Sequence, residues 1–523
     1  MAEELLRVWD NFDGGLGQAK DRGSNELYSI RDNFTTPALV GYNGVLMSSG
    51  LETALSQAVT SGYIFLHAIH DLSSTLHVVY LFCTNGTNTE IYKYSGENAT
   101  NWAARGTITL TNIAAGRPEK YQGSWYFTGT NDHATARLMH KLAITGAADI
   151  IAGDVTTGDA NSGDGDLLML GHQLSKIQRA SGISILATAA DPLVDANWGS
   201  DFPSGDSSEQ LLGAASVEGL SFVLRSPGVY SYNDRGRAGL VTDDLVPWRT
   251  AATTSVAWSA TSWKTGIVFS HPSGLYFYRP GQPLLPIGME RKFSSKYYND
   301  AALLGRAIPK AVQGVGEFLY VSYAVPTHTG SSYVNVIACA TSLDGTPYNL
   351  SWTIIDIGSS TSYSRGLAVL LGVTPNSSGD ASLVFQEDAT TLKHKPLGPR
   401  GAPAGVYIGA AIKAVTGSHV YLPELTFSPP LATARLRVYL VNMDSGSSYQ
   451  MRVSINGAIL STLPNIGGPL GANSTVYDVP INYPAHISTL VISPQLTYDA
   501  SATTYTNGAI SRIELWGTKV SLG

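Results

Sequence analysis

Gly266-Ile-Val-Phe-Ser-His-Pro-Ser-Gly-Leu-Tyr-Phe-Tyr-Arg-Pro-Gly281 is the stretch that decides the fold. An apolar run over residues 267–269 is followed by a Pro-Ser-Gly turn and by a second apolar run over residues 275–278. Branched and aromatic side chains favour strands, and Pro and Gly favour the turn between them. The stretch therefore predicts a β-hairpin.

The same hairpin plan recurs along most of the chain. Six further copies lie at residues 77–96, 125–141, 166–179, 220–234, 318–337 and 382–395. One first-strand residue marks each of the seven copies: Val79, Tyr126, Leu168, Phe222, Val268, Leu319 and Val384. A strand-rich period of roughly 40–50 residues is typical of propeller blades, which stack around an axis because no blade can bury its faces alone. The sequence predicts an all-β protein with a β-propeller of about seven blades.

The domain boundaries follow from changes in composition. Residues 1–50 precede the repeats and contain a hairpin over residues 31–47, which we expect to pair with the last blade and close the ring. The propeller then occupies residues 51–398, and the one credible helix, residues 50–58, is short. A Pro- and Gly-rich linker precedes residues 405–523, whose alternating strands predict a jelly-roll-like β-sandwich. Its closing stretch, residues 510–517, is similar to the last strand of galactose-binding-like sandwiches.

Charge and hydropathy exclude several classes of partner. The net charge is −7 with 33 Lys and Arg residues, and no basic run occurs, so we expect no sequence-specific nucleic acid binding. No apolar run approaches the ~20 residues that span a bilayer. The N-terminus lacks the pattern of a secretory signal, so we expect synthesis in a cytoplasm.

The sequence predicts no metal site and no cofactor. His67 and His70 lie three apart on a strand and so point to opposite faces. A polar loop carries Asp159, Asn161, Asp164 and Asp166, whose oxygens suit calcium but do not follow the order of an EF-hand, so a solvated loop is expected with calcium as the alternative. The two cysteines, Cys83 and Cys339, lie in apolar strands and are expected to be buried free thiols.

Sialidase-like propellers are enzymes, but the chain lacks their complete catalytic motifs. Residues 342–346, Ser-Leu-Asp-Gly-Thr, form one isolated and incomplete copy of the repeated box of those enzymes. Residues 234–237, Asp-Arg-Gly-Arg, offer arginines but are more typical of a solvated turn. No Gly-x-Ser-x-Gly, His-Glu-x-x-His or phosphate-binding loop is present. We therefore predict that the chain is not an enzyme, with glycoside hydrolysis as the alternative.

The N-terminal 50 residues carry a resemblance to a known family. Phe12-Asp-Gly-Gly-Leu-Gly17, Arg31-Asp-Asn-Phe34 and the segment over residues 41–50 resemble the opening of β-propeller structural proteins of bacteriophage tails. The resemblance implies a nozzle, tail-tip or minor tail protein, located in the virion and present in several copies. It also implies contacts with other tail proteins and with copies of itself.

Two sets of aromatic residues are candidate contact sites. We expect Trp9, Phe12 and Phe34 to dock onto a neighbouring protein, with packing onto the chain's own blades as the alternative. If the sandwich binds a host surface glycan, Tyr439, Tyr449 and Tyr477 are candidate stacking platforms, with packing between strands as the alternative. Two further hypotheses remain open: a carbohydrate-binding or glycan-cleaving tail adhesin, and a bacterial interaction propeller unrelated to phage.

Overall fold

The structure is a computed structural model of the chain. It describes residues 2–14, 16–17, 27–28, 39–42, 45–48, 53–71, 78–95, 102–130, 137–144, 149–160, 163, 165–170, 172–178, 182–200, 210–217, 220–226, 229–232, 238–242, 260–271, 274–279, 282–292, 307–326, 333–357, 367–370, 380–386, 388–399, 418–419, 422, 425–441, 449–455, 458–459, 475–481, 486–490, 492–498 and 509–520.

The hairpin predicted from Gly266 to Gly281 is confirmed. Strand β24 (Gly266–His271) pairs antiparallel with β25 (Gly274–Tyr278), so that Val268 lies opposite Phe277. Strands β23 (Ala260–Trp263) and β26 (Leu285–Pro286) complete a four-stranded sheet. Both faces of this sheet are covered, because Ile267, Val268 and Phe269 are all 0% exposed.

In the described part of the chain, seven antiparallel sheets of three to five strands follow one another, and each of the seven marker residues lies in one of them. The first sheet contains β7 (Ile64–Asp71), β8 (Val78–Thr84), β9 (Thr89–Ser95) and β10 (Ala103–Leu110). The second contains β11 (Ala114–Ala115), β12 (Glu119–Tyr121), β13 (Ser124–Thr130), β14 (Leu138–Leu142) and β15 (Val155–Ala160). The third contains β16 (Asp166–Leu170), β17 (Gln173–Gln178) and β18 (Gly182–Ile185). The fourth sheet contains β19 (Gln210–Val217), β20 (Leu220–Ser226), β21 (Val229–Tyr232) and β22 (Ala238–Thr242), and the fifth is the sheet of β23 to β26. The sixth contains β27 (Ile308–Val315), β28 (Phe318–Pro326), β29 (Tyr333–Ser342) and β30 (Leu350–Ile357). The seventh contains β31 (Leu367–Leu370), β32 (Asp380–Gln386), β33 (Leu392–Pro399) and β6 (Thr53–Ala54).

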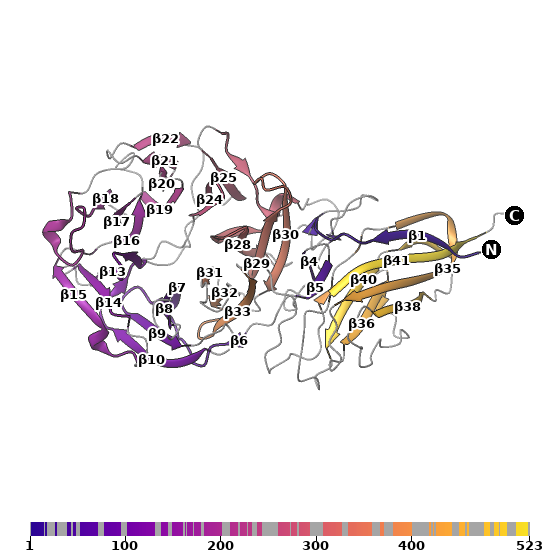
Figure 1. Cartoon of the computed structure of the whole chain (residues 1–523), viewed down its shortest axis with the longest axis horizontal. Helices are drawn as coiled ribbons and strands as arrows, with labels where there is room; N and C mark the ends of the chain where they lie inside the picture. The colour runs from indigo at the N-terminus through magenta and orange to yellow at the C-terminus, as the bar shows by residue number, and fades with distance from the viewer. Residues whose placement is uncertain are drawn as a thin grey trace.

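The sheets are arranged as the blades of a closed propeller (Figure 1). The first strands of successive blades contact one another from β19 through β23, β27 and β31 to β7, and so face the axis of the ring. Apolar side chains from neighbouring blades form shared clusters, such as Phe82 of the first blade against Phe127 of the second, with ring centres 5.3 Å apart. The predicted fold class is therefore confirmed.

The ring is closed by a short seam between the two ends of the propeller. Strand β6 pairs with β33, placing Ala54 opposite Lys393. The side chain of Gln386 on β32 accepts a hydrogen bond from the Phe65 N–H at 2.9 Å and donates one to the Tyr63 carbonyl at 3.0 Å. The last blade thus takes its outer strand from the N-terminal part of the chain.

Two predictions about this region are wrong. The hairpin over residues 31–47 contains β4 (Leu39–Tyr42) and β5 (Val45–Ser48), but β5 pairs with the C-terminal sandwich, with Met47 opposite Ala509. The next stretch of chain, β6, takes the edge of the last blade instead. We expected a helix over residues 50–58, but residues 53–54 form strand β6. Pairing with β33 outweighs the weak helical propensity of this stretch.

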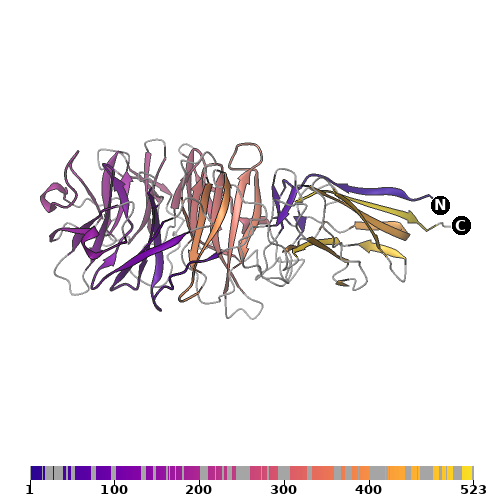
Figure 2. The ribbon, with the colours of Figure 1, turned by 60° about the horizontal axis from the view of Figure 1, so that its bottom comes forward.

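The C-terminal domain is a two-sheet sandwich beside the ring (Figures 1 and 2). Its larger sheet is built on β35 (Leu425–Val441), which pairs with β38 (Thr475–Ile481), β39 (Ile487–Leu490) and β41 (Ala509–Lys519). On its other edge β41 pairs with β1 (Glu4–Trp9) and with β5. The second sheet contains β34 (Ser418–His419), β40 (Ile492–Tyr498), β36 (Tyr449–Ile455) and β37 (Ala458–Ile459). The start of β1 and the end of β41 lie at the end of the sandwich far from the ring (Figure 2).

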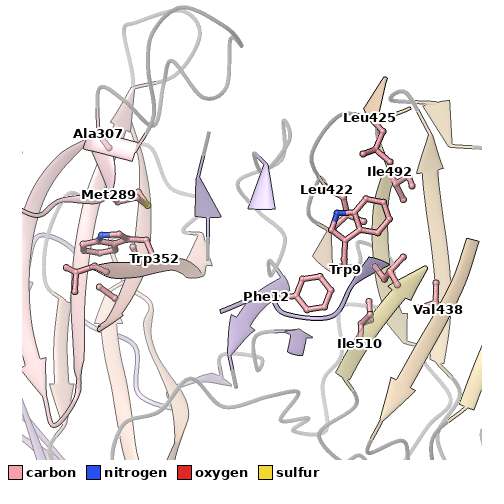
Figure 3. Packing of buried hydrophobic residues seen from close by; sticks show 14 of the residues in the cluster. Trp9, Phe12, Met289, Ala307, Trp352, Leu422, Leu425, Val438, Ile492 and Ile510 are labelled. Carbon is pink, nitrogen blue, oxygen red and sulfur yellow. The ribbon is translucent and has the colours of Figure 1, made fainter. Parts of the chain in front are cut away.

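One apolar cluster includes residues of the sandwich and of the neighbouring blades. Figure 3 shows Trp9 and Phe12 on the sandwich side, with Met289 and Trp352 on the propeller side. Between the two domains lie β4 and β2 (Leu16–Gly17), and both contact β30. The N-terminal segment therefore forms part of the joint between propeller and sandwich.

Candidate functional site

The larger sheet of the sandwich has one apolar face and one polar face. Along β35, Leu436, Val438 and Leu440 are at most 1% exposed, whereas the alternate residues Arg435 and Arg437 are partly exposed. Successive side chains of a strand point to opposite faces, so this alternation separates an inner from an outer face. The neighbouring strand β41 alternates in the same way, with Ile513 and Leu515 buried at 0% exposure.

Strand register brings the outer residues into rows. Arg435 lies opposite Trp516 on β41 and Pro480 on β38, and Tyr439 lies opposite Arg512 and Val476. Trp516 also lies opposite Leu5 of β1. We call this surface the sandwich face and define it by Glu3, Leu5, Arg435, Arg437, Tyr439, Val476, Asp478, Arg512, Glu514 and Trp516.

Ion pairs connect the centre of the sandwich face. Asp478 accepts hydrogen bonds from Arg435 Nη1 at 2.7 Å and from Arg437 Nε and Nη2 at 2.9 and 3.1 Å. Arg435 also donates to both carboxylate oxygens of Glu3, at 3.2 and 2.7 Å. Paired donors of this kind fix the plane of a guanidinium as well as its position.

The guanidinium groups of Arg435 and Arg437 lie over the ring of Trp516. Its centre is 5.7 Å from Cζ of Arg435 and 5.8 Å from Cζ of Arg437. Its Nε1–H donates to Glu514 at 2.9 Å, and Glu514 in turn pairs with Arg512 at 2.6 Å. Arg512 lies 5.5 Å from the ring centre of Tyr439. Two aromatic rings are thus held in place among charged groups.

These interactions keep the central groups charged. The hydrogen bond from Arg437 lowers the pKa of Asp478, and the nearby charge of Arg435 lowers it further. The hydrogen bond with Glu3 raises the pKa of Arg435, and the one with Asp478 raises the pKa of Arg437. Asp478, Arg435 and Arg437 are therefore ionised and mutually paired at neutral pH.

The structure places the predicted aromatic residues in different settings. Tyr439 lies on the sandwich face. Tyr449 and Tyr477 lie opposite Tyr498 and Val438 in their ladders, and their side chains are outside the described residues.

Of the three residues predicted to dock onto a neighbouring protein, the structure describes Trp9 and Phe12 but not Phe34. Trp9 and Phe12 are only 6% and 1% exposed and pack within the chain itself, which is the alternative to docking onto a neighbour. The cluster that holds them contains sandwich residues as well as blade residues. Phe34 lies outside the described residues.

Sequence reasoning missed Trp516, Arg435, Arg437 and Asp478. The signal for Arg435, Arg437 and Trp516 was the alternation within residues 434–441 and 510–516, which predicted strands. Asp478 lies outside both stretches. The polar members of each alternation form the outer face. What the sequence lacked was the register that brings three strands together.

A second polar cluster lies where the first three blades meet. Arg117 has Glu119 at 3.9 Å, and its backbone N–H donates to Asp166 at 2.7 Å. Burial lowers the pKa of Arg117 to about 10. Burial, reinforced by the charge of Arg117, holds the pKa of His67 well below its ordinary value. The hydrogen bond to Asp166 ties the second blade to the third, which gives the cluster a structural role.

The remaining sequence candidates are structural or lie outside the described residues. Cys83 and Cys339 are buried free thiols, as predicted. Asp344 of the incomplete box accepts bonds from the N–H and Oγ1 of Thr346 at 2.9 and 2.6 Å, so it stabilises its own turn. Asn161, Asp164 and residues 234–237 are not described.

Among the described residues, no three His, Cys, Asp or Glu side chains are grouped to hold a metal ion. No helix in the described part of the chain is long and apolar enough to cross a membrane.

No protein-family model and no curated protein sequence matches the chain. Solved structures that are similar include a puromycin-hydrolysing peptidase of Mycobacterium tuberculosis, at 8% identity and a TM-score of 0.39, covering 66% of this chain and 54% of the peptidase. An exo-β-1,3-galactanase of Phanerochaete chrysosporium aligns at 11% identity and a TM-score of 0.28, covering 88% and 100%. A sialidase of Trypanosoma rangeli aligns at 10% identity and a TM-score of 0.28, covering 94% and 95%. At these values the similarities assign no activity to this chain, and its fold rests on the strand pairing described above.

Proposed function

We propose that the chain binds carbohydrate through the sandwich face and that the propeller is the scaffold that carries the sandwich. The observation that carries the proposal is the setting of Trp516, whose ring lies 5.7 and 5.8 Å from two guanidinium groups that Asp478 holds in place. A sugar ring has an apolar face of C–H groups and an edge of hydroxyls. The sandwich face offers a partner for each.

The apolar part of the interaction would come from the aromatic rings. Tyrosine and tryptophan combine a large apolar surface with a polar edge, which suits an amphipathic ligand. Leu5 and Val476, which are 43% and 46% exposed, extend the apolar surface at two edges of the sandwich face.

The polar part would come from the paired charges. A carboxylate can accept several hydrogen bonds and a guanidinium can donate five, so both keep capacity for ligand hydroxyls after pairing with each other. Because the ion pairs hold these side chains before a ligand arrives, binding costs less side-chain ordering.

The direct test is a glycan array probed with the full chain and with Trp516→Ala. We expect binding by the parent chain and loss of at least tenfold in affinity in the variant, on the order of the energy of one well-placed stacking contact. The matched control is Tyr348→Ala, which removes an aromatic ring that is 59% exposed on the propeller. Equal binding by the parent chain and Trp516→Ala would overturn the proposal. Release of reducing sugar during the assay would point instead to the hydrolase alternative.

A second candidate function is a structural role in a bacteriophage tail, in line with the N-terminal resemblance. The observation that favours it is the place of the matching residues. Phe12 is buried, and the segments that carry the resemblance contribute β2, β4 and β5 to the joint between the domains. We infer that these residues are framework and that the chain is a virion component.

The virion assignment is tested by mass spectrometry of phage particles purified by density gradient. We expect peptides of this chain in several copies per particle, and their absence from intact particles would exclude it. The two functions are compatible, since a tail protein that binds host glycan would be an adhesin.

A further inference from the structure

The described charges of the sandwich face balance one another. Three basic groups, Arg435, Arg437 and Arg512, pair with three carboxylates, Asp478, Glu514 and Glu3. The ion-pair distances run from 2.6 to 2.9 Å, and each basic group is within this range of a carboxylate. The described face thus has a formal net charge of zero.

This balance decides which ligand charge the sandwich face can accept. An acidic sugar would have to compete with Asp478 for Arg435 and Arg437, and the displaced carboxylate would then repel the ligand. A basic sugar would meet the same problem at Asp478 and Glu514. An uncharged ligand can bond to the outer lone pairs and N–H groups without breaking an ion pair.

Glu514 is the buried carboxylate of the sandwich face. The side chain of Glu514 is 5% exposed, and it already binds both Arg512 and the Trp516 Nε1–H. Removing its partner would leave a buried charge, which is strongly destabilising. The Trp516 ring is therefore anchored by an interaction that a ligand gains nothing by breaking.

We propose that the ligand of the sandwich face is a neutral, hydroxyl-rich polysaccharide without carboxylate or sulfate groups, an inference that rests on the proposed carbohydrate-binding function. Its sugar rings stack on Trp516, and its hydroxyls bond to the Arg435–Asp478–Arg437 group. Binding of such a ligand depends little on salt, because no counter-ions are displaced from paired charges.

The test uses polysaccharides that share a backbone and differ in charge. Hydroxyethylcellulose is compared with carboxymethylcellulose, and dextran with dextran sulfate, in affinity electrophoresis of the full chain at low and high salt. We expect a neutral member to bind at least tenfold more tightly than its charged counterpart, with an affinity that changes less than about twofold over the salt range.

Asp478→Asn provides the decisive variant, because it leaves Arg437 without its carboxylate and gives the face one unmatched positive charge. We expect this variant to gain salt-sensitive binding to carboxymethylcellulose. Tighter binding of the parent chain to the charged polymers, lost in Trp516→Ala, would overturn the neutral-ligand inference while leaving carbohydrate binding in place. Absence of binding to every polymer and to the glycan array would overturn both.

Discussion

The N-terminal part of the chain completes both domains, but the two joints are built differently. The propeller seam uses the two-residue strand β6 and two hydrogen bonds from one buried side chain, Gln386. The sandwich joint uses the six-residue strand β1 along β41 and buries Trp9 in the apolar interior. The seam also shares an apolar cluster, in which Leu55 and Phe65 pack with Val384. The comparison teaches that the seam adds a buried amide to its apolar contacts, whereas the sandwich joint adds a long strand pairing. The outer face of the same sandwich sheet is the surface to which our proposal assigns carbohydrate binding.

Trp9→Ala should give the largest loss of stability. Removing a buried tryptophan loses apolar burial and leaves a cavity, which costs about 3–5 kcal/mol. Hydrogen exchange should rise in β35 and β41 and stay low in the first blade. The matched control is Trp516→Ala on the outer face, which should change stability by about 1 kcal/mol or less. Equal destabilisation by the two variants would contradict the division between the faces.

Gln386→Leu should come next and should act on the other domain. It leaves the Phe65 N–H and the Tyr63 carbonyl without their side-chain partner, at a cost of about 2–4 kcal/mol for two buried groups. Exchange should rise in β7, β32 and β33, with the sandwich unaffected. The same substitution at Gln282, which is exposed, serves as the control. If Gln386→Leu unfolds at the same midpoint as Gln282→Leu, the seam does not rest on this amide.

The contributions of Glu290 and Asp478 to stability depend on pH in opposite directions, because burial raises the pKa of Glu290 and arginine contacts lower that of Asp478. Glu290 is 7% exposed, and burial raises its pKa above 4.5, although the Leu275 N–H donates to it at 3.0 Å and Tyr323 and Arg291 lie near it. A raised pKa in the folded state means that stability is lost as the pH rises through that pKa. Glu290→Gln should therefore unfold at a higher denaturant concentration than the parent chain at pH 8 and show little difference at pH 4. A parent chain with the same pH profile as the variant would contradict this account.

Asp478→Asn should have the smallest effect on stability. Its side chain is 44% exposed, and exposed ion pairs contribute about 0–1 kcal/mol. Because Arg437 and Arg435 lower the pKa of Asp478, any contribution is present at neutral pH and is lost as the pH falls through that lowered pKa. The variant should keep the parent midpoint at pH 7 within the precision of a thermal scan. A large loss there would show that the sandwich face is built for stability.

The propeller could be predicted from sequence because its information is local. Val268 and the other six marker residues sit in hairpins whose turns and apolar runs are visible in short windows. The destination of the hairpin over residues 31–47 was missed because β5 pairs with Ala509, more than 450 positions away along the chain. The site was missed for the same reason. Tyr439 was singled out as an aromatic, but the partners of Trp516 come from three strands whose register no local pattern specifies.

Hydroxyl-radical footprinting of the full chain with and without saturating neutral polysaccharide tests the central claim most directly. Protection should fall on Trp516 and Tyr439, while exposed residues of the propeller such as Tyr348 and Leu343 should stay equally reactive. Protection confined to the propeller, with Trp516 unchanged, would contradict the assignment of carbohydrate binding to the sandwich face.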